Sequence, residues 1–122
     1  RQREAYNKKQ EEIRSLICSA EVNKAIHAGA QNKHIPSSKG YIEGRSYLFG
    51  DLEGAQALVE RYAGTGTAVL TRKGDWANKE IILSDEVIGA AVDLETGKAE
   101  ETKKFVIHYG KSGAHIVPAK EG

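Results

Sequence analysis

The sequence lacks several features that would decide its structural class at once. Cys18 is the only cysteine among 122 residues, so neither a disulfide framework nor a four-ligand cysteine site for zinc can form. There are two prolines, and no apolar run approaches the roughly 18 residues expected of a membrane-spanning helix. Neither sign of charge dominates, because 18 Lys and Arg residues stand against 17 Asp and Glu residues. A strong general affinity for nucleic acid is therefore not indicated by composition.

What is present suits one folded domain. Apolar residues make up 39% of the chain, enough for a single core in 122 residues. No signal-peptide pattern is seen, and the chain begins with Arg1 rather than methionine, so we expect a fragment of a longer protein. We expect residues 1–22 to be an N-terminal helix or a linker from the parent chain, and residues 23–122 to be the functional domain.

The first 28 residues have helical periodicity. Ile13, Leu16, Ile17 and Ala20 recur at spacings of three and four, with charged residues between them. We expect this helix to be followed by one or two further helical turns over residues 20–28, which end at Gly29.

A loop composition follows from Gly29 to Tyr41, rich in Gly, Pro, Ser and Asn. It places Lys33 and His34 on an irregular connection, where catalytic residues are over-represented. A cation beside an imidazole favours the neutral, basic form of that histidine. A solvated basic loop is an equally good interpretation of this segment when it is considered alone.

A second helix is expected after Asp51, which suits the N-cap position. Its apolar stripe comprises Leu52, Ala55, Leu58, Val59 and Tyr62. The Gly64-Thr-Gly66 segment then follows a helix and precedes a strand, the reverse of the order in a dinucleotide-binding motif. We therefore interpret it as a helix end and a turn.

Short apolar runs alternate with turn residues in the second half of the chain. They predict consecutive antiparallel strands at residues 67–72, 76–83, 87–94, 102–109 and 114–118. Helices first and strands afterwards predict an α+β domain, in which N-terminal helices pack on one face of a twisted four- to five-stranded antiparallel sheet. The other face is then free to carry a site.

The last two expected strands form the strongest local signal. They flank a tight Gly110–Gly113 segment, which predicts a hairpin with Lys111 and Ser112 in the turn. His108 then lies opposite His115, and strand alternation puts both on the face opposite Tyr109. A lone strand histidine is more often structural than catalytic, and a one-residue slip in register would separate this pair. With the predicted register, however, two imidazoles stand side by side near a cation.

These side-chain types favour one kind of chemistry. No His-x-x-x-His pattern, cysteine pair or acidic cluster indicates a metal, so we expect neither metal nor cofactor. Ser112 lacks the Gly-x-Ser-x-Gly context of an acyl nucleophile. Histidines with cations can cleave RNA: one imidazole takes the ribose 2′-OH proton, a second group protonates the leaving 5′-oxygen, and cations stabilise the phosphorane.

Five sequence blocks also stand out together. They are Gln31-Asn-Lys33-His34-Ile35, Tyr41-Ile-Glu-Gly44-Arg45-Ser46, Tyr62-Ala-Gly-Thr-Gly66, Gly74-Asp-Trp76-Ala-Asn78-Lys79-Glu80 and Phe105-Val-Ile-His108-Tyr109-x-Lys111-x-Gly113-x-His115-Ile-Val-Pro118. In this order they resemble the polymorphic toxin type 50 family of bacterial ribonuclease toxins. The resemblance covers about residues 23–119 of the chain.

The resemblance implies a fold like that of barnase, EndoU, the tRNA-cleaving colicins and RelE. It implies a metal-independent endoribonuclease that leaves a 2′,3′-cyclic phosphate, with tRNA as the usual target and a cognate immunity protein as partner. Such toxins end large secreted or surface proteins, including contact-dependent growth inhibition effectors, and act in the target-cell cytoplasm. The matching positions imply catalytic roles for Lys33, His34, His108, Tyr109 and His115, and RNA or phosphate binding by Lys111, Arg45 and Lys79. The resemblance leads us to expect a serine after Tyr109, but this chain has Gly110 there. The role of that serine is therefore absent, or Ser112 has taken it.

Two other classes of function remain open. Similar segments end some phage head-morphogenesis proteins, where the same residues would serve a non-catalytic RNA-binding or structural module. A metal-dependent nuclease is the third class, and sensitivity to a chelator would reveal it. The sequence does not assign the acid and the base among the histidines.

Overall fold

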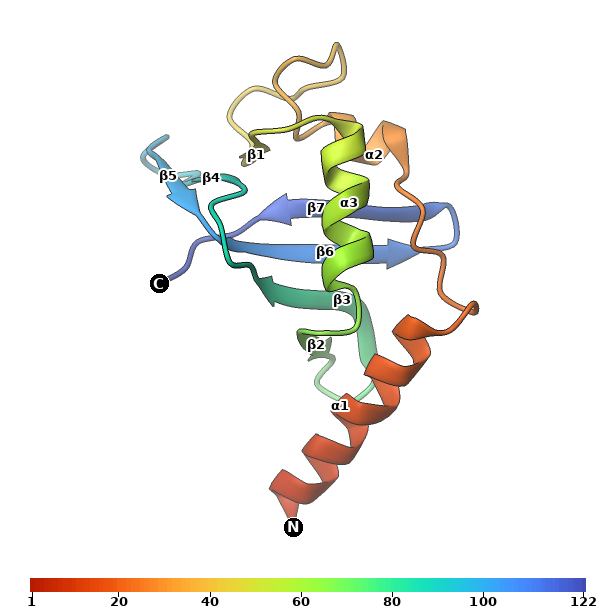
Figure 1. Ribbon diagram of the computed structural model, residues 1–122. Helices are drawn as coiled ribbons and strands as arrows, with labels where there is room; N and C mark the ends of the chain where they lie inside the picture. The colour runs from red at the N-terminus through yellow and green to blue at the C-terminus, as the bar shows by residue number, and fades with distance from the viewer.

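The computed structural model describes residues 1–122 and shows helices and antiparallel strands in one folded unit (Figure 1). The helices are α1 (Gln2–Cys18), α2 (Ala28–Asn32) and α3 (Leu52–Tyr62). The strands are β1 (Tyr47–Leu48), β2 (Thr67–Leu70), β3 (Trp76–Leu83), β4 (Gly89–Val92), β5 (Ala99–Thr102), β6 (Lys104–Gly110) and β7 (Gly113–Pro118). The predicted α+β class is confirmed. None of the helices has the length and apolar character needed to cross a membrane.

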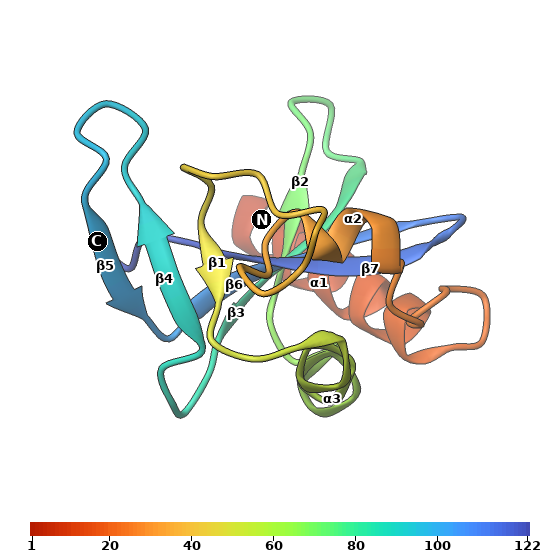
Figure 2. The same cartoon turned by 90° about the horizontal axis from the view of Figure 1, so that it is seen from above.

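The strands form two sheets, whereas a single consecutive meander was expected. The main sheet has four antiparallel strands in the order β2-β3-β6-β7, and a second sheet has the order β1-β4-β5. Figure 2 shows the second sheet at one end of the main sheet. The strand predicted at residues 87–94 is β4, which pairs with β1 and β5 rather than with β3. That expectation was wrong because apolar alternation marks a strand but does not say which sheet it joins.

One bent length of chain belongs to both sheets. β5 and β6 are separated by Lys103 alone, and the bend is fixed by Thr102, which is 1% exposed. The Thr102 hydroxyl donates to the Ala119 carbonyl oxygen at 2.6 Å. β5 itself was not predicted, because its exposed Glu100 and Glu101 have no apolar alternation.

The core lies between the main sheet and the helices α1 and α3. The inward side chains of β6 and β7, among them Phe105, Ile107 and Ile116, are fully buried. Ile17 of α1 and Val59 of α3 pack in the same cluster, and α3 crosses the face of the sheet in Figure 1. The opposite face of these strands is not covered by α1 or α3, so it is free, as expected from the sequence.

Helix α3 begins and ends where the sequence predicts. The Asp51 carboxylate accepts a hydrogen bond from the Gly54 N–H at 2.9 Å, which satisfies one of the free donors of the first turn. After the helix, Gly64 has a φ of +85°, a left-handed conformation that suits a glycine. A Cβ at Gly64 would also collide with the Cys18 sulfur of α1.

Buried glutamines cover both edges of the main sheet. On β2, the Gln10 amide donates to the Ala68 carbonyl at 2.9 Å and accepts from the Ala68 N–H at 2.8 Å. On β7, Gln31 does the same to Ile116, at 2.9 Å and 2.7 Å. Each amide thus takes the place of a neighbouring strand, which prevents exposed edge pairing and fixes α1 and α2 to the sheet.

The connection from α1 to α2 differs from the prediction. Residues 20–28 were expected to be helical, but Ile26 instead forms a parallel bridge with Ala114 of β7. Helix α2 begins at Ala28, where the expected helix ends, and extends into the expected loop. The backbone of this segment is engaged by distant partners: the His27 N–H donates to Ala114, and the Ile26 N–H donates to the Gln56 side chain. Local periodicity cannot reveal such partners.

Candidate active site

The β6–β7 hairpin has the predicted register. His108 pairs with His115, Tyr109 with Ala114, and Gly110 with Gly113, so Lys111 and Ser112 form the turn. Gly113 has a φ of +126°, and a Cβ there would collide with the Ala25 carbonyl oxygen. The hairpin tip therefore requires glycine at this position, where the chain before α2 lies against β7.

Three imidazoles stack beside the uncovered face of the main sheet. The ring centroids of His108 and His115 are 4.6 Å apart with planes at 14°. On the other side of His115, the His34 ring lies nearly parallel, at 9°, with its centroid 6.2 Å away. The structure thus brings a loop histidine to the predicted hairpin pair and makes a row with His115 in the middle.

His34 is held in place by its own backbone and by its ring. Its Nδ1 lies 2.8 Å from the Ser46 carbonyl oxygen, and its own carbonyl oxygen accepts from the Leu48 N–H of β1 at 2.8 Å. A carbonyl oxygen can only accept, so Nδ1 carries the proton and Nε2 of the neutral ring has a free lone pair. Ser46 is fixed in turn, because its hydroxyl oxygen accepts from the Val92 N–H of β4 at 3.0 Å.

The stack keeps its members neutral. Burial lowers the pKa of His34, and the positive charges of Arg45 and Lys33 lower it further. The hydrogen bond that the ring donates to the Ser46 carbonyl oxygen acts in the opposite direction, but the pKa remains below its ordinary value. Burial and Lys79 lower the pKa of His108. His115, between the other two rings, has its pKa lowered to about 4 by burial and by the neighbouring histidines. Each positive charge would lie next to others, so protonation of the stack is disfavoured.

Exposed cations lie around the stack. Lys79 of β3 is directly opposite His108, while Lys33 and Arg45 act electrostatically on His34. At the hairpin tip, Lys111 and Ser112 line an open pocket of about 260 Å³ together with His108 and His115. The predicted site residues therefore come together, with one exception.

Tyr109 is the exception. The sequence interpretation assigned it to stacking on a base or donating to phosphate, but its side chain lies on the helix-covered face and is 8% exposed. Its hydroxyl donates to the Glu80 carboxylate at 2.8 Å. Burial and the Glu80 charge raise the pKa of Tyr109, so it stays protonated. The reason is strand alternation, which turns Tyr109 away from its neighbour His108.

Sequence reasoning missed the residues that position the site. Gln31 anchors α2 to β7 and so delivers the following Lys33 and His34 to the hairpin. Glu80 is fully buried, and it accepts from Tyr109 and from the backbone N–H groups of Gly64 and Gly66. Both stand within the motif blocks quoted above, which is the one sequence signal that could have found them. The buried Glu80 carboxylate therefore has three hydrogen-bond donors, which compensate for its burial without a neighbouring cation.

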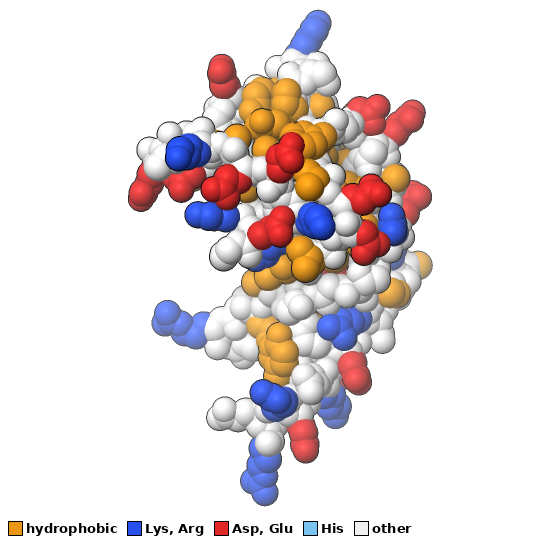
Figure 3. All heavy atoms as spheres, turned by 60° about the vertical axis from the view of Figure 1, so that its left-hand side comes forward, with side chains coloured by type: hydrophobic (Ala, Val, Ile, Leu, Met, Phe, Trp, Pro, Cys, Tyr) orange, Lys and Arg blue, Asp and Glu red, His pale blue; other side chains and the backbone are white.

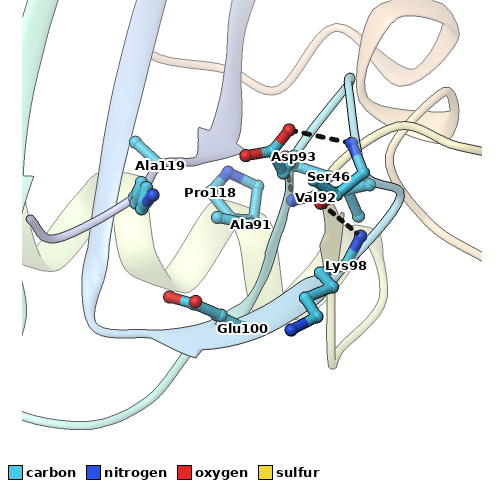
Figure 4. Close-up of a pocket in the computed structure, with 10 residues that line it drawn as sticks. Ser46, Ala91, Val92, Asp93, Lys98, Glu100, Pro118 and Ala119 are labelled. Atoms are coloured by element: carbon cyan, nitrogen blue, oxygen red, sulfur yellow. Dashed lines mark hydrogen bonds between the residues drawn. The ribbon is translucent and has the colours of Figure 1, made fainter.

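The rest of the surface offers no comparable constellation. Figure 4 shows another hollow of similar size, about 270 Å³, between the second sheet and the end of β7, where Asp93 and Glu100 lie among the lysines. Figure 3 shows acidic side chains mixed with basic ones and no histidine on the face turned toward the viewer. No group of three or more His, Cys, Asp or Glu side chains could hold a metal ion.

A comparison with protein families identifies a relationship for most of the chain. The sequence model of the family described as bacterial toxin 50 matches residues 26–118, which include all the residues of the stack and its cations. No curated protein matches the chain.

Proposed function

The chain belongs to the bacterial toxin 50 family, a family of polymorphic toxin domains, and on this premise we propose that it is an antibacterial toxin that cleaves RNA without a metal ion. The observation that carries the proposal is the row of His34, His115 and His108 among exposed cations. Imidazoles move protons near neutral pH, and lysine and arginine bind phosphate. Together they supply the proton transfer and the charge stabilisation that transesterification of a phosphodiester requires.

In this proposal His34 is the general base. Its protonated Nδ1 donates to Ser46, so Nε2 accepts the proton of the ribose 2′-OH. Its lowered pKa keeps Nε2 unprotonated at neutral pH. The 2′-oxygen then attacks the adjacent phosphorus, and the bond to the 5′-oxygen of the next nucleotide breaks, which leaves a 2′,3′-cyclic phosphate.

The general acid comes from the coupled pair of His108 and His115. Without substrate their pKa values are lowered, so the pair holds little charge. A bound phosphodiester brings a negative charge next to the pair and raises its proton affinity. The proton acquired in this way goes to the leaving 5′-oxygen. The two rings are in contact, so they titrate as a unit and the acid is assigned to the pair.

The cations stabilise the transition state and hold the RNA. Lys33 and Lys79 flank the two ends of the stack, and we assign them to the charge that develops on the phosphorane oxygens. Lys111, Ser112 and Arg45 contact neighbouring phosphates. Tyr109 is assigned a positioning role: it holds β6 to Glu80 and does not touch substrate.

The biological setting follows from the same premise. We propose that the RNA is tRNA, that the domain is delivered as part of a larger secreted or surface protein, and that it acts in the target-cell cytoplasm. A cognate immunity protein would cover the cations with an acidic surface. We also propose that residues 23–122 alone do not make the folding unit, because Ile13 and Ile17 of α1 lie in the core.

The test is RNA cleavage by the purified chain. Total bacterial RNA incubated with wild type should give discrete tRNA-sized fragments with cyclic phosphate ends, with or without EDTA. His34→Ala and His115→Ala should abolish the fragments, while Lys98→Ala, outside the stack, should not. Intact RNA after incubation with folded wild type would refute the enzyme and favour the alternative, a non-catalytic RNA-binding or structural module like those of phage head proteins. Fragments that disappear with EDTA would instead reveal a metal-dependent nuclease.

A further inference from the structure

His27 is the one histidine of the chain that the stack does not include. It directly precedes α2, and its backbone is extended, with a φ of −84° and a ψ of 103°. Its N–H donates to the Ala114 carbonyl oxygen at 2.8 Å, and the Ala114 N–H donates to the Ala25 carbonyl oxygen at 2.7 Å. This segment therefore lies along the outer edge of β7, where the chain passes the hairpin tip (Figure 1).

Strand alternation places the His27 side chain on the same face as His115. Ile26 forms a parallel bridge with Ala114, which lies in the core cluster, and Ile26 packs against that cluster. The next residue of each segment, His27 and His115, then points to the opposite, uncovered face. His27 accordingly lines the pocket at the hairpin tip together with His108 and His115. After burial and the other stacked histidines, its charge is among those that lower the pKa of His115.

The two nitrogens of the His27 ring have different tasks. Nδ1 accepts a hydrogen bond from the Ala30 N–H at 2.9 Å, so it caps α2. A nitrogen that accepts carries no proton, and the proton of the neutral ring is therefore on Nε2, which has no partner in the protein. His34 is the reverse, because its Nδ1 donates and its Nε2 is free to accept. His34 thus suits the removal of a proton, whereas His27 suits the donation of a hydrogen bond.

The hairpin-tip pocket offers several donors to a ligand. Lys111 brings an ammonium group and Ser112 a hydroxyl, and His27 adds its Nε2–H. No Asp or Glu lines this pocket of about 260 Å³, so no carboxylate there opposes an anion. The turn is held against the segment that carries His27, because the Asn23 side chain donates to the Lys111 carbonyl oxygen at 3.2 Å. Phosphate oxygens only accept hydrogen bonds, so a phosphate is the ligand that these donors suit.

We propose that the hairpin-tip pocket binds a phosphate of the RNA next to the scissile one, and that His27 donates to this phosphate from Nε2. Lys111 and Ser112 supply the other contacts. His34, the base of the proposed reaction, does not line the pocket, so the phosphate held there is a neighbour of the one that reacts. The inference rests on the proposed ribonuclease function and adds to it a histidine that binds substrate. A second phosphate held in this way fixes the position of the RNA backbone along the stack.

Two variants separate the two nitrogens of His27. His27→Asn keeps a favoured N-cap residue, with an acceptor in place of Nδ1, but removes Nε2. His27→Gln places an amide N–H near the position of Nε2 but loses the cap. RNA cleavage kinetics are measured for each, and so is binding of a short labelled single-stranded DNA, which has phosphates but no 2′-OH to react. Lys98→Ala, outside the pocket, is the control, and urea unfolding checks that every variant is folded.

His27→Asn should bind the DNA about tenfold more weakly, the effect of one lost hydrogen bond to an anion. Its KM for RNA should rise by a similar factor while kcat stays within about twofold, because the contact is made before and during the reaction alike. His27→Gln should keep the DNA affinity within about threefold of wild type, since it restores a donor. Its unfolding midpoint should fall, because α2 loses its cap.

Wild-type DNA affinity in His27→Asn would overturn the inference and leave His27 as a cap alone. A fall in kcat with an unchanged KM would also overturn it, because His27 would then act on the reacting phosphate. Equal losses in His27→Asn and His27→Gln would assign the effect to packing of the ring and not to Nε2. DNA binding that depends on His27 in a protein that leaves RNA intact would refute the ribonuclease function but support the phosphate site.

Discussion

The two faces of the β6–β7 hairpin take alternate residues from the same strands and treat polar groups in opposite ways. On the covered face, Tyr109 donates to Glu80, whose carboxylate also accepts from two backbone N–H groups. On the uncovered face, His108 and His115 stack on each other, and no protein group binds their ring nitrogens. One face uses polar side chains to hold the fold together, and the other leaves them free for a ligand.

This difference in hydrogen bonding distinguishes polar residues that stabilise the fold from polar residues that are available to a ligand. On the covered face no buried polar side-chain atom lacks a partner, so its polar residues contribute to stability. On the uncovered face the pKa values of the histidines are lowered, so the stack resists charging and gains no salt bridge. The stack is therefore not explained by stability. We expect substitutions on the covered face to change stability, and those on the uncovered face to change activity.

The largest expected effect is on the uncovered face. His34→Asn keeps a donor for the Ser46 carbonyl oxygen but loses Nε2, so RNA cleavage should fall by roughly 10³-fold while the denaturation midpoint stays near that of wild type. Cleavage rate and urea unfolding are measured on the same preparation. Activity within a few-fold of wild type would remove His34 from the base role.

The next effect is on the covered face. Glu80→Ala leaves the Tyr109 hydroxyl and the N–H groups of Gly64 and Gly66 without their acceptor, and should lower the free energy of unfolding by about 3 kcal/mol. Glu86→Ala, at an exposed glutamate further along the chain, should change the free energy of unfolding little and serves as the control. Urea unfolding measures both. A Glu80→Ala protein as stable as the control would show that this carboxylate does not hold the fold.

The pH dependence of stability should come from the uncovered face. His115 has a pKa of about 4 in the folded protein, below the ordinary value of 6.5, so the unfolded chain binds more protons between these values. Stability should therefore be constant above pH 6.5 and should fall as the pH is lowered toward 4. Thermal unfolding across this range checks the slope. His115→Ala should reduce the slope and leave the part that comes from His34 and His108, whose pKa values are also lowered. An unchanged slope would assign the effect to groups other than His115.

The smallest effect distinguishes the two faces most directly. Tyr109→Phe removes one of three donors to Glu80 and should cost about 1 kcal/mol of stability, with the cleavage rate per folded molecule unchanged. The ratio of the two readouts is compared with that of His108→Ala, its neighbour in β6, for which the reverse is expected. A Tyr109→Phe protein that is stable but inactive would return Tyr109 to the catalytic residues.

Local signals predicted much of this molecule. Two glycines around Lys111 and Ser112 set the hairpin register, and alternation assigned His108 and His115 to one face. Asp51 and the apolar stripe after it gave α3. Such features depend on residues close in the chain, where turn chemistry and periodicity act directly. These local features were sufficient to predict the α+β class and the His108–His115 pair of the candidate site.

Other features depend on partners that are distant in the sequence. Hydrogen bonds to distant residues fix the β5–β6 bend at Thr102 and the extended Ile26 segment. The second sheet likewise joins strands that are far apart in the chain. The position of His34 beside the hairpin also depends on distant partners, because Gln31 of α2 bonds to Ile116 of β7 and the His34 ring bonds to the Ser46 carbonyl oxygen. Strand alternation turns Tyr109 away from the histidines, and only its partner Glu80, on another strand, shows what the hydroxyl does there.

The sequence by itself determined which residues could do chemistry and placed two of the three histidines beside each other. Only the tertiary structure decided that His34 completes the row, which of its nitrogens is free, and that Tyr109 serves the core. The physical reason is that proton transfer depends on distances of a few ångströms and on burial. Both are set by how the loop, the second sheet and the hairpin pack together, and not by any one of them alone.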